Sequence, residues 1–281
     1  EEYLARRALD HRIGFSISPN LWRKLPGSRS AWRVQSVALK LICEREIEIE
    51  KFNIEEYWSI SSIFSTAKEE KFSSRLTILN SHKLAKMDIK NEKEADLALE
   101  DIKKSKFNIS KIELKRVKRN PLPPFTTSTL QQEASNKLGF SASRTMRVAQ
   151  KLYEGINIGN ETSGLITYMR TDGVQLSSQA IEELRNEITN RHGENYTPQK
   201  PRVYKSKAAN AQEAHEAIRP TLISRDPESI SQFLDSDQNK LYKLIWKRTI
   251  SSQMQSAELD ETAADIANQD ETVIFRANGS Q

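Results

Sequence analysis

The pattern of apolar and polar positions predicts helices in the first fifty residues. Residues 4–12 are predicted to be a basic helix, and a short second helix is expected from Ser18 to Pro26, where the proline ends it. Between residues 31 and 50, apolar side chains recur every three to four positions, so one face of a helix should be buried. That face consists of Val34, Val37, Ala38, Leu41 and Ile42.

After residue 52 the apolar positions alternate. Residues 57–64, 75–79 and 106–117 are predicted to be strands, and the charged stretch 90–104 is predicted to be a helix. This part of the chain is therefore expected to be β-rich with one helix.

Closely spaced prolines in residues 120–125 mark a rigid boundary, because they cannot continue a helix or a central strand. Two helices follow, one ending at residues 137–138 and the other spanning 142–153, with Gly139 in the turn between them. This is a helix-turn-helix-like pattern.

The remainder alternates between helix and strand. Residues 177–191 should be a helix that starts at a serine cap, and residues 226–250 should hold two helices. The segment after Ala257 alternates again and is predicted to be a strand.

Composition and charge favour a polyanionic partner. The 281 residues carry a net charge of +5, with basic residues crowded into residues 6–33 and 111–119. No apolar run approaches the roughly 20 residues needed to span a bilayer. Cys43 is the only cysteine, so no disulfide can form within the chain; we expect a buried structural thiol and a reducing, cytoplasmic location. Because the chain starts without methionine, inside a helical pattern, we expect a piece of a larger protein.

Residues 164–172 carry the clearest candidate chemistry. If residues 165–170 are extended, Tyr168 and Arg170 point to the same side. A free phenol is almost wholly protonated at neutral pH, and a fixed guanidinium favours the phenolate and grips phosphate oxygens. An alternative is a half-buried strand with an exposed tyrosine and arginine and no catalytic role.

Six strings in one order resemble the type IA DNA topoisomerases, over nearly the whole chain. They are ARRALD (5–10), SAWRVQSVA (30–38), PPFTTSTLQQ (123–132), AQKLYE (149–154), GLITYMRTD (164–172) and EAHEAIRPT (213–221). Met169 points to the bacterial topoisomerase I branch, since other branches usually have proline there.

The resemblance implies a multidomain α+β fold, the central region of a toroidal enzyme. The implied parts are a helical DNA-binding segment (1–51), the first part of a β-rich arch (52–119), a helix-turn-helix-like domain with the active-site tyrosine (120–224), a return to the arch (225–256) and the start of a further base domain (257–281).

The resemblance also implies an activity, the ATP-independent relaxation of negatively supercoiled DNA. Tyr168 would cut one strand through a 5′-phosphotyrosyl intermediate, and Arg170 would hold the phosphate. His215 would lie near the same phosphate, where an imidazole can donate a hydrogen bond or relay protons. Arg219 is left open between a phosphate contact and an anchor for its loop.

The N-terminal helix and the loop after it resemble the segment that binds single-stranded DNA. The candidate residues are Arg6, Arg7, Asp10, Phe15, Trp22, Ser30, Ala31, Trp32, Arg33, Val34 and Gln35, together with Arg170. Whether Phe15 and Trp22 stack on bases or pack in a core is left open. Trp32 departs from the family, which usually has glycine there, so close approach of the backbone to DNA is in doubt.

The cofactor implied for the whole enzyme is Mg²⁺, held by an acidic cluster on a domain that this chain does not contain. We therefore expect the chain alone to bind single-stranded DNA weakly, to be inactive and to hold no metal. We also expect a monomer that binds no ATP and has no membrane partner. Two rival interpretations are a non-catalytic DNA clamp module and an unrelated tyrosine strand-transfer enzyme, but the arginine and histidine sets that the latter needs are not seen.

Overall fold

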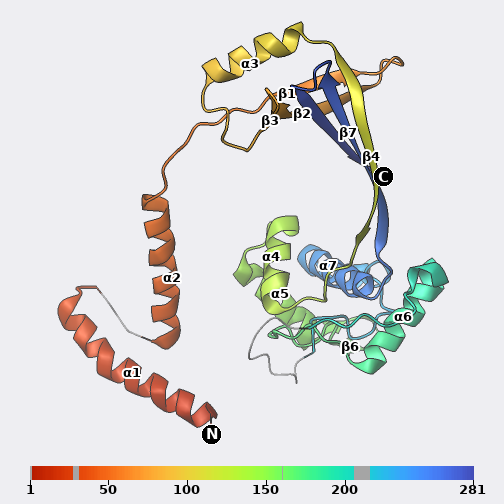
Figure 1. Cartoon of the computed structure of the whole chain (residues 1–281). Helices are drawn as coiled ribbons and strands as arrows, with labels where there is room; N and C mark the ends of the chain where they lie inside the picture. The colour runs from red at the N-terminus through yellow and green to blue at the C-terminus, as the bar shows by residue number, and fades with distance from the viewer. Residues whose placement is uncertain (1, 28–31, 160, 206–215) are drawn as a thin grey trace. The chain divides into compact units, whose positions relative to one another are not determined.

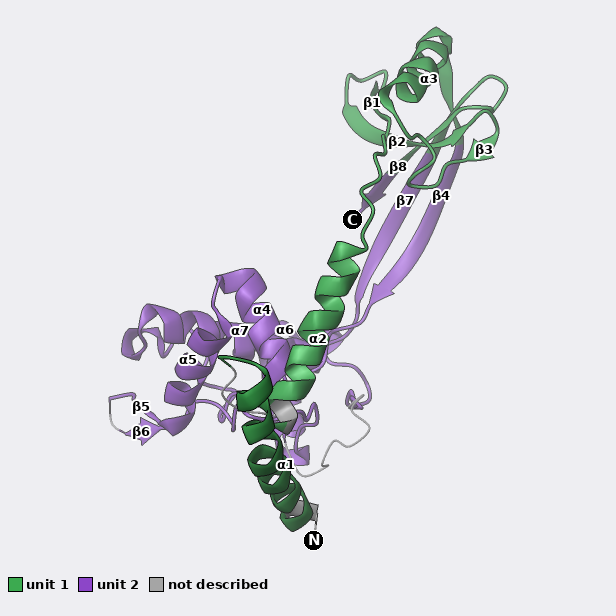
Figure 2. Cartoon of the chain, turned by 90° about the vertical axis from the view of Figure 1, so that its left-hand side faces the viewer, with its two compact units in different colours: residues 1–110, 265–277 green, residues 111–264, 278–281 purple. Residues whose placement is uncertain are grey.

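The computed structural model describes residues 2–27, 32–159, 161–205 and 216–281. These residues form two compact units, one of residues 1–110 and 265–277 and one of residues 111–264 and 278–281 (Figure 2). The boundary between the units falls within strands that start in one unit and end in the other. The finer, five-part division stays a prediction.

The first unit begins with helix α1 (Glu2–Lys24) and helix α2 (Arg33–Glu50) (Figure 1). The prediction of two helices before residue 26 was wrong, because α1 runs through Pro19 without a break. Proline removes one backbone N–H donor from the helix. The Asn20 side-chain amide donates to the Ser16 carbonyl at 3.2 Å and so adds a hydrogen bond next to this gap.

The apolar face of α2 is not buried as predicted. Val37, Leu41 and Ile42 are each more than half exposed, and Cys43 is exposed as well. Helical spacing shows which side of a helix is apolar but says nothing about which element covers it. The expectation of a buried thiol was therefore wrong.

A six-stranded sheet follows in the order β1-β2-β8-β7-β4, with β3 paired to β2. Its strands are β1 (Ser61–Ser65), β2 (Lys71–Leu79), β3 (His82–Lys83), β4 (Phe107–Arg119), β7 (Ala257–Asn268) and β8 (Ile274–Ser280). β1 is shorter than predicted because the Trp58 backbone N–H donates to the Ile89 carbonyl instead of joining the strand pairing.

Aromatic rings hold together strands that lie far apart in the sequence. Phe64 on β1 contacts Phe72, Phe107 and Phe275, with ring centroids 5.6–6.0 Å apart. Phe275, from β8, is fully buried. Helix α3 (Glu92–Lys104), capped by the Asn91 side chain, buries a face of small and apolar residues.

The second unit is mainly helical. Its helices are α4 (Thr127–Leu138), α5 (Ala142–Glu154), α6 (Ser178–His192) and α7 (Ser236–Ser252), with the single turns η1 (Glu194–Tyr196) and η2 (Ser231–Phe233). A small hairpin pairs β5 (Ile156–Asn157) with β6 (Thr162–Ser163). Of the two helices expected in residues 226–250, only α7 forms as an α-helix.

The predicted helix-turn-helix-like pair is confirmed. The Thr126 side chain caps the start of α4, and Gly139 ends it with a φ of 66°, a conformation that glycine adopts without strain. The Ser141 hydroxyl then caps α5. Both helices pack against α7 around a core that includes fully buried Leu130, Leu152 and Leu241.

Candidate active site

The loop between β6 and α6 carries Tyr168 and Arg170. The extended conformation considered for residues 165–170 does not form, because the segment bends and makes a single bridge, from Ile166 to Pro220. Both side chains are exposed nevertheless: Tyr168 is 45% exposed and Arg170 is exposed, while Met169 between them is buried. Leu165, Ile166 and Met169 belong to the helical core, so they fix the loop while the two polar side chains face solvent.

The first turn of α4 holds the loop on one side. The Thr127 hydroxyl donates to the carbonyls of Met169 at 2.7 Å and Thr171 at 3.1 Å. The same oxygen accepts the Thr171 backbone N–H at 2.9 Å, and the Thr127 N–H donates to the Thr171 carbonyl at 2.9 Å. One threonine therefore restrains the backbone on both sides of Arg170.

The segment 216–221 holds the loop on a second side. The Thr167 N–H donates to the Arg219 carbonyl at 2.9 Å, and the Thr167 hydroxyl donates to the Ala217 carbonyl at 2.7 Å. Thr221 donates through its hydroxyl to the Gly164 carbonyl and through its N–H to the Leu165 carbonyl. The residue before Tyr168 is thus fixed through both its backbone and its side chain.

The end of α5 forms a third support. The Leu165 N–H donates to the Leu152 carbonyl at 2.7 Å, and the Tyr153 ring lies edge-on to the Tyr168 ring with 5.4 Å between centroids. A Cβ on Gly164 would lie 2.6 Å from the Tyr153 carbonyl oxygen, closer than real contacts allow. Glycine is therefore required where the chain passes α5.

Arg219 anchors its own loop, one of the two roles that the sequence left open, and a phosphate contact stays a prediction. Its guanidinium forms two hydrogen bonds to the Glu216 carboxylate, at 2.8 and 3.1 Å, and one to the Pro220 carbonyl. The same carboxylate accepts the Ser177 N–H at 2.9 Å. Burial raises the pKa of Glu216, but Arg219 and the Ser177 N–H lower it by more, so it lies below its ordinary value.

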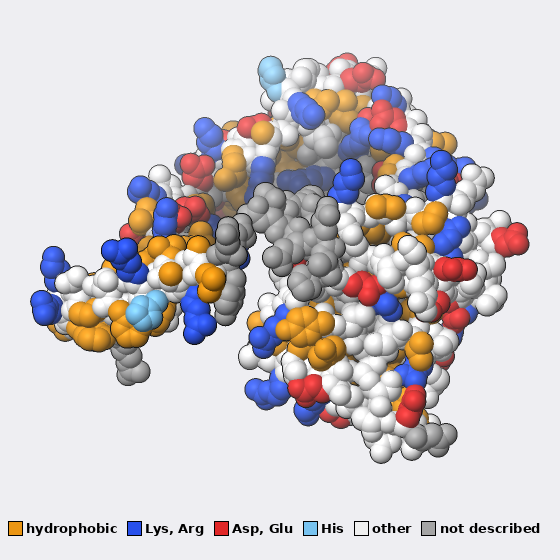
Figure 3. All heavy atoms as spheres, turned by 90° about the horizontal axis from the view of Figure 1, so that it is seen from below, with side chains coloured by type: hydrophobic (Ala, Val, Ile, Leu, Met, Phe, Trp, Pro, Cys, Tyr) orange, Lys and Arg blue, Asp and Glu red, His pale blue; other side chains and the backbone are white. Residues whose placement is uncertain are grey.

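The candidate DNA-binding residues of the first unit are largely exposed. Arg6 and Arg7 are exposed, Asp10 is half-buried, and Phe15 and Trp22 are 66% and 58% exposed, so neither aromatic packs in a core. Figure 3 shows hydrophobic, histidine and basic side chains side by side along α1.

Trp32 stands at the start of α2 and packs on α1. Its ring lies edge-on to Phe15 at 6.5 Å between centroids, and a Cβ on Gly14 would come within 2.8 Å of the indole. The indole that replaces the family's glycine thus rests on the bare backbone at Gly14. Gln35 is exposed on α2.

Several candidates lie outside the described residues. These are His215, Ser30 and Ala31, and for Arg33 and Val34 the side chains only. Among the residues that are described, no group of three or more His, Cys, Asp or Glu side chains could hold a metal ion. The part of the chain seen here therefore does not fit a Mg²⁺ centre. Nor does any described helix have the length and apolar character to cross a membrane.

Sequence reasoning missed the supports of the tyrosine loop. Thr127, Thr167 and Tyr153 carry no catalytic signature. The one available signal was that Thr167 and Tyr153 lie within strings that carried the family resemblance.

Comparison with known proteins shows the family of the chain. A family model described as DNA topoisomerase matches residues 1–281. DNA topoisomerase 1 of Rickettsia felis is 56% identical over 98% of this chain, which spans 36% of that protein. DNA topoisomerase 1 of Zymomonas mobilis is 52% identical over 99% of the chain and 22% of that protein.

The fold also matches a solved structure. Full-length topoisomerase I from Thermotoga maritima superposes with a TM-score of 0.80 at 37% identity, covering 99% of this chain and 43% of that one. The chain thus spans about a third of the length of the Rickettsia relative that it matches. The multidomain α+β architecture expected from the sequence is confirmed, and the chain belongs to the DNA topoisomerase family, in its type IA branch.

Proposed function

We propose that this chain is the nucleophile-bearing part of an enzyme that relaxes negatively supercoiled DNA without ATP. The observation that carries the proposal is the Tyr168 side chain, 45% exposed on a loop whose neighbouring residues are fixed from three sides. A nucleophile held in this way needs little reorganisation before it attacks. An ordinary surface tyrosine would not need such support.

The chemistry is a pair of reversible transesterifications. The Tyr168 hydroxyl oxygen attacks a backbone phosphorus, loses its proton and displaces the 3′-oxygen of the adjoining nucleotide, which takes up a proton. The products are a 5′-phosphotyrosyl end and a free 3′-hydroxyl. After strand passage the 3′-oxygen attacks the same phosphorus and releases Tyr168. Because the phosphoester bond is conserved, resealing needs no nucleotide hydrolysis.

Arg170 is proposed to hold the phosphate oxygens and stabilise the charge that develops on them. His215 is proposed to act near the same phosphate. The exposed residues of α1 and the start of α2 are proposed to bind single-stranded DNA upstream of the cut. We also propose that the enzyme is a monomer and that it works on bacterial DNA at the nucleoid.

For the whole enzyme we propose Mg²⁺ as the cofactor, with ligands outside this chain, and no step described here depends on it. The 281-residue chain alone is then expected to bind a single-stranded oligonucleotide weakly and to leave a supercoiled plasmid unchanged. Relaxation by the purified chain would contradict this part of the proposal.

The nucleophile is tested in the longer enzyme that contains this chain. Tyr168→Phe should abolish the covalent DNA adduct while oligonucleotide binding stays within about twofold, because one hydroxyl contributes little to binding a polyanion. Tyr153→Phe is the matched control, since it removes a phenol from the adjacent ring and should leave the adduct intact. An adduct that persists in Tyr168→Phe would rule out the assignment.

A further inference from the structure

The first unit contains a pocket of about 600 Å³ that has no role in the proposed cleavage reaction. Its walls come from the segment before β1, from β2 and from the loop after β3, and its floor includes the buried residues Ile60, Leu76 and Ile89. It lies wholly within residues 57–89, so every contact discussed below belongs to one compact unit.

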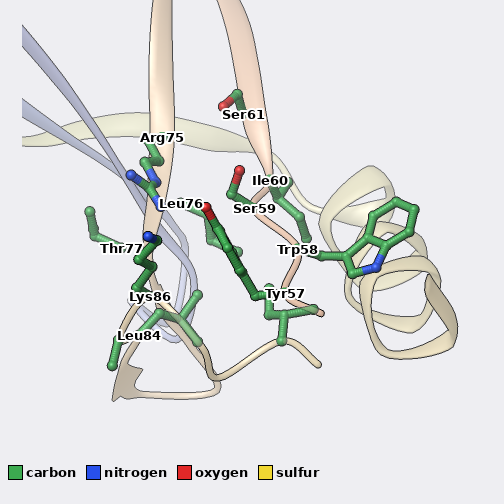
Figure 4. Close-up of a pocket in the computed structure, with 12 residues that line it drawn as sticks. Tyr57, Trp58, Ser59, Ile60, Ser61, Arg75, Leu76, Thr77, Leu84 and Lys86 are labelled. Atoms are coloured by element: carbon green, nitrogen blue, oxygen red, sulfur yellow. The ribbon is translucent and has the colours of Figure 1, made fainter. Parts of the chain in front are cut away.

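One aromatic ring and two cations dominate the opening. The Lys86 ammonium lies over the Tyr57 ring, 4.7 Å from its centroid, and Tyr57 as a residue is still 42% exposed. Figure 4 shows Arg75, on β2, and Lys86 beside Tyr57, whereas the neighbouring Trp58 turns away toward α3. A flat apolar face therefore adjoins two positive charges.

Neither Arg75 nor Lys86 is held in an ion pair by the part of the chain that the structure describes. None of the residues that line the pocket is acidic. Two carboxylates near the pocket in sequence accept other donors: Asp88 accepts the Ala85 N–H at 2.6 Å, and Glu56 accepts the Trp58 indole N–H at 2.6 Å. An anionic ligand would meet cations without displacing a protein partner.

Backbone hydrogen bonds hold the walls in place. The Trp58 N–H donates to the Ile89 carbonyl at 2.8 Å, and the Leu76 N–H donates to the Ile60 carbonyl at 2.9 Å. On the other side the Leu84 N–H donates to the Thr77 carbonyl at 2.8 Å. The pocket is therefore formed before any ligand arrives, which lowers the cost of binding.

We propose that this pocket binds one nucleotide unit of single-stranded DNA, with its phosphate on Arg75 and Lys86 and its base against the exposed face of Tyr57. Stacking on an aromatic ring beside backbone-neutralising cations is how proteins hold single strands without reading sequence. An isolated phosphate would make no use of the ring. The proposal rests on the proposed function only in taking DNA as the ligand, and it is independent of Tyr168 as nucleophile.

The first test measures binding of a fluorescent oligothymidylate to the 281-residue chain carrying Tyr168→Phe. The double variant Arg75→Gln/Lys86→Gln should bind more weakly, and its log–log salt dependence should flatten by about 0.7 for each phosphate that the protein no longer neutralises. The control Lys71→Gln/Lys83→Gln removes the same charge from exposed sites on β2 and β3 that do not line the pocket. Equal reductions in affinity for the two double variants, or no measurable binding by the parent, would overturn the proposal.

The second test separates the base from the phosphate. Tyr57→Leu should lower the affinity for oligothymidylate about tenfold and leave the affinity for an abasic oligonucleotide of equal length unchanged. Tyr196→Leu, at a ring of similar exposure in the other unit, should affect neither. If oligoglutamate displaces oligothymidylate as well as an unlabelled single strand does, the pocket is a general acidic-peptide site and the proposal fails.

The two proposals can fail separately. Failure of the nucleophile assignment would show as a covalent adduct that persists in Tyr168→Phe. That cleavage assay does not involve the pocket variants. Failure of the pocket assignment would show only in the binding measurements above, made on a chain that cannot cleave.

Discussion

The ring of Tyr153 lies edge-on to the ring of Tyr168, with 5.4 Å between their centroids. Both rings are partly exposed, and Tyr153 sits near the end of α5, which is itself capped and packed into the core. The contact links the orientation of the proposed nucleophile to a rigid helix, and its effects can be measured.

Tyr153→Ala should slow formation of the covalent DNA adduct in the longer enzyme. An edge-to-face pair is worth about 0.5–1.5 kcal/mol, which corresponds to roughly a two- to tenfold lower rate if the contact serves mainly to orient Tyr168. Tyr153→Phe keeps the ring and should retain the rate. Oligonucleotide binding by both variants should be unchanged, and equal adduct rates for the two would remove the orienting role.

Thr127→Val should destabilise the second unit. The substitution keeps the shape of the side chain but leaves the Met169 carbonyl without its 2.7 Å donor and removes the acceptor of the Thr171 N–H. The expected cost is about 1–3 kcal/mol in the free energy of urea unfolding. Thr127→Ser retains the hydroxyl and should recover most of that stability, whereas equal stabilities of the Val and Ser variants would contradict the hydrogen-bonding role.

Gly164→Ala should be more harmful than an ordinary surface substitution. Its Cβ would lie 2.6 Å from the Tyr153 carbonyl oxygen, and a backbone atom cannot move aside as a flexible side chain can. The expected cost is about 1–3 kcal/mol, measured as a lower midpoint of thermal unfolding. Gly279→Ala is the control because a Cβ there meets nothing within 4 Å. Similar midpoints for both variants would show that the loop can move away from α5.

Acid should weaken the network that holds residues 216–221. Because the pKa of Glu216 is lower in the folded chain than in the unfolded one, this group stabilises the fold above its unfolded pKa, near about 4.3. That contribution is lost as pH falls through the folded-state pKa. Glu216→Gln should therefore unfold more easily than the parent at about pH 7.

The difference between Glu216→Gln and the parent should shrink as pH falls from the unfolded pKa through the lower folded-state pKa of Glu216, below which both carry an uncharged group. Unfolding free energies measured from neutral to acid pH test this. Glu182→Gln, at an exposed carboxylate of α6, is the control and should follow the parent throughout. A gap between Glu216→Gln and the parent that stays constant with pH would mean that the ion pair with Arg219 is not its source.

The sequence predicts the elements whose signals are local. The serine cap before α6 and the glycine that ends α4 place those helix ends almost to the residue, because hydroxyl caps and left-handed glycines act on their own neighbourhood. The prediction of two separate helices before residue 26 failed because its signal was not local in this sense. Whether a helix continues through proline depends on compensation elsewhere, here partly by Asn20.

The site was predictable in its chemistry but not in its support. Tyr168 and Arg170 stand out as residue types, and buried Met169 between them preserves their shared exposure even though no strand forms. The hydrogen bonds of Thr127 and Thr167 span about forty to fifty positions of sequence, and no periodic pattern encodes such contacts. The exposure of the apolar face of α2 was not predictable either, since periodicity shows which side of a helix is apolar but not whether another element packs on it.

The sheet order bears on how the chain folds. β2 pairs with β8, so residues near 75 cannot complete their ladder until residues near 275 are available, and residues 111–264 of the tyrosine-bearing unit lie between them. Closing so long a loop is slow unless the intervening chain has already become compact. We therefore expect the helical unit to fold first. Its folding would shorten the loop between the strands and so bring Phe275 close to Phe64. On a ribosome, the aromatic cluster of the sheet would be among the last parts of this chain to assemble.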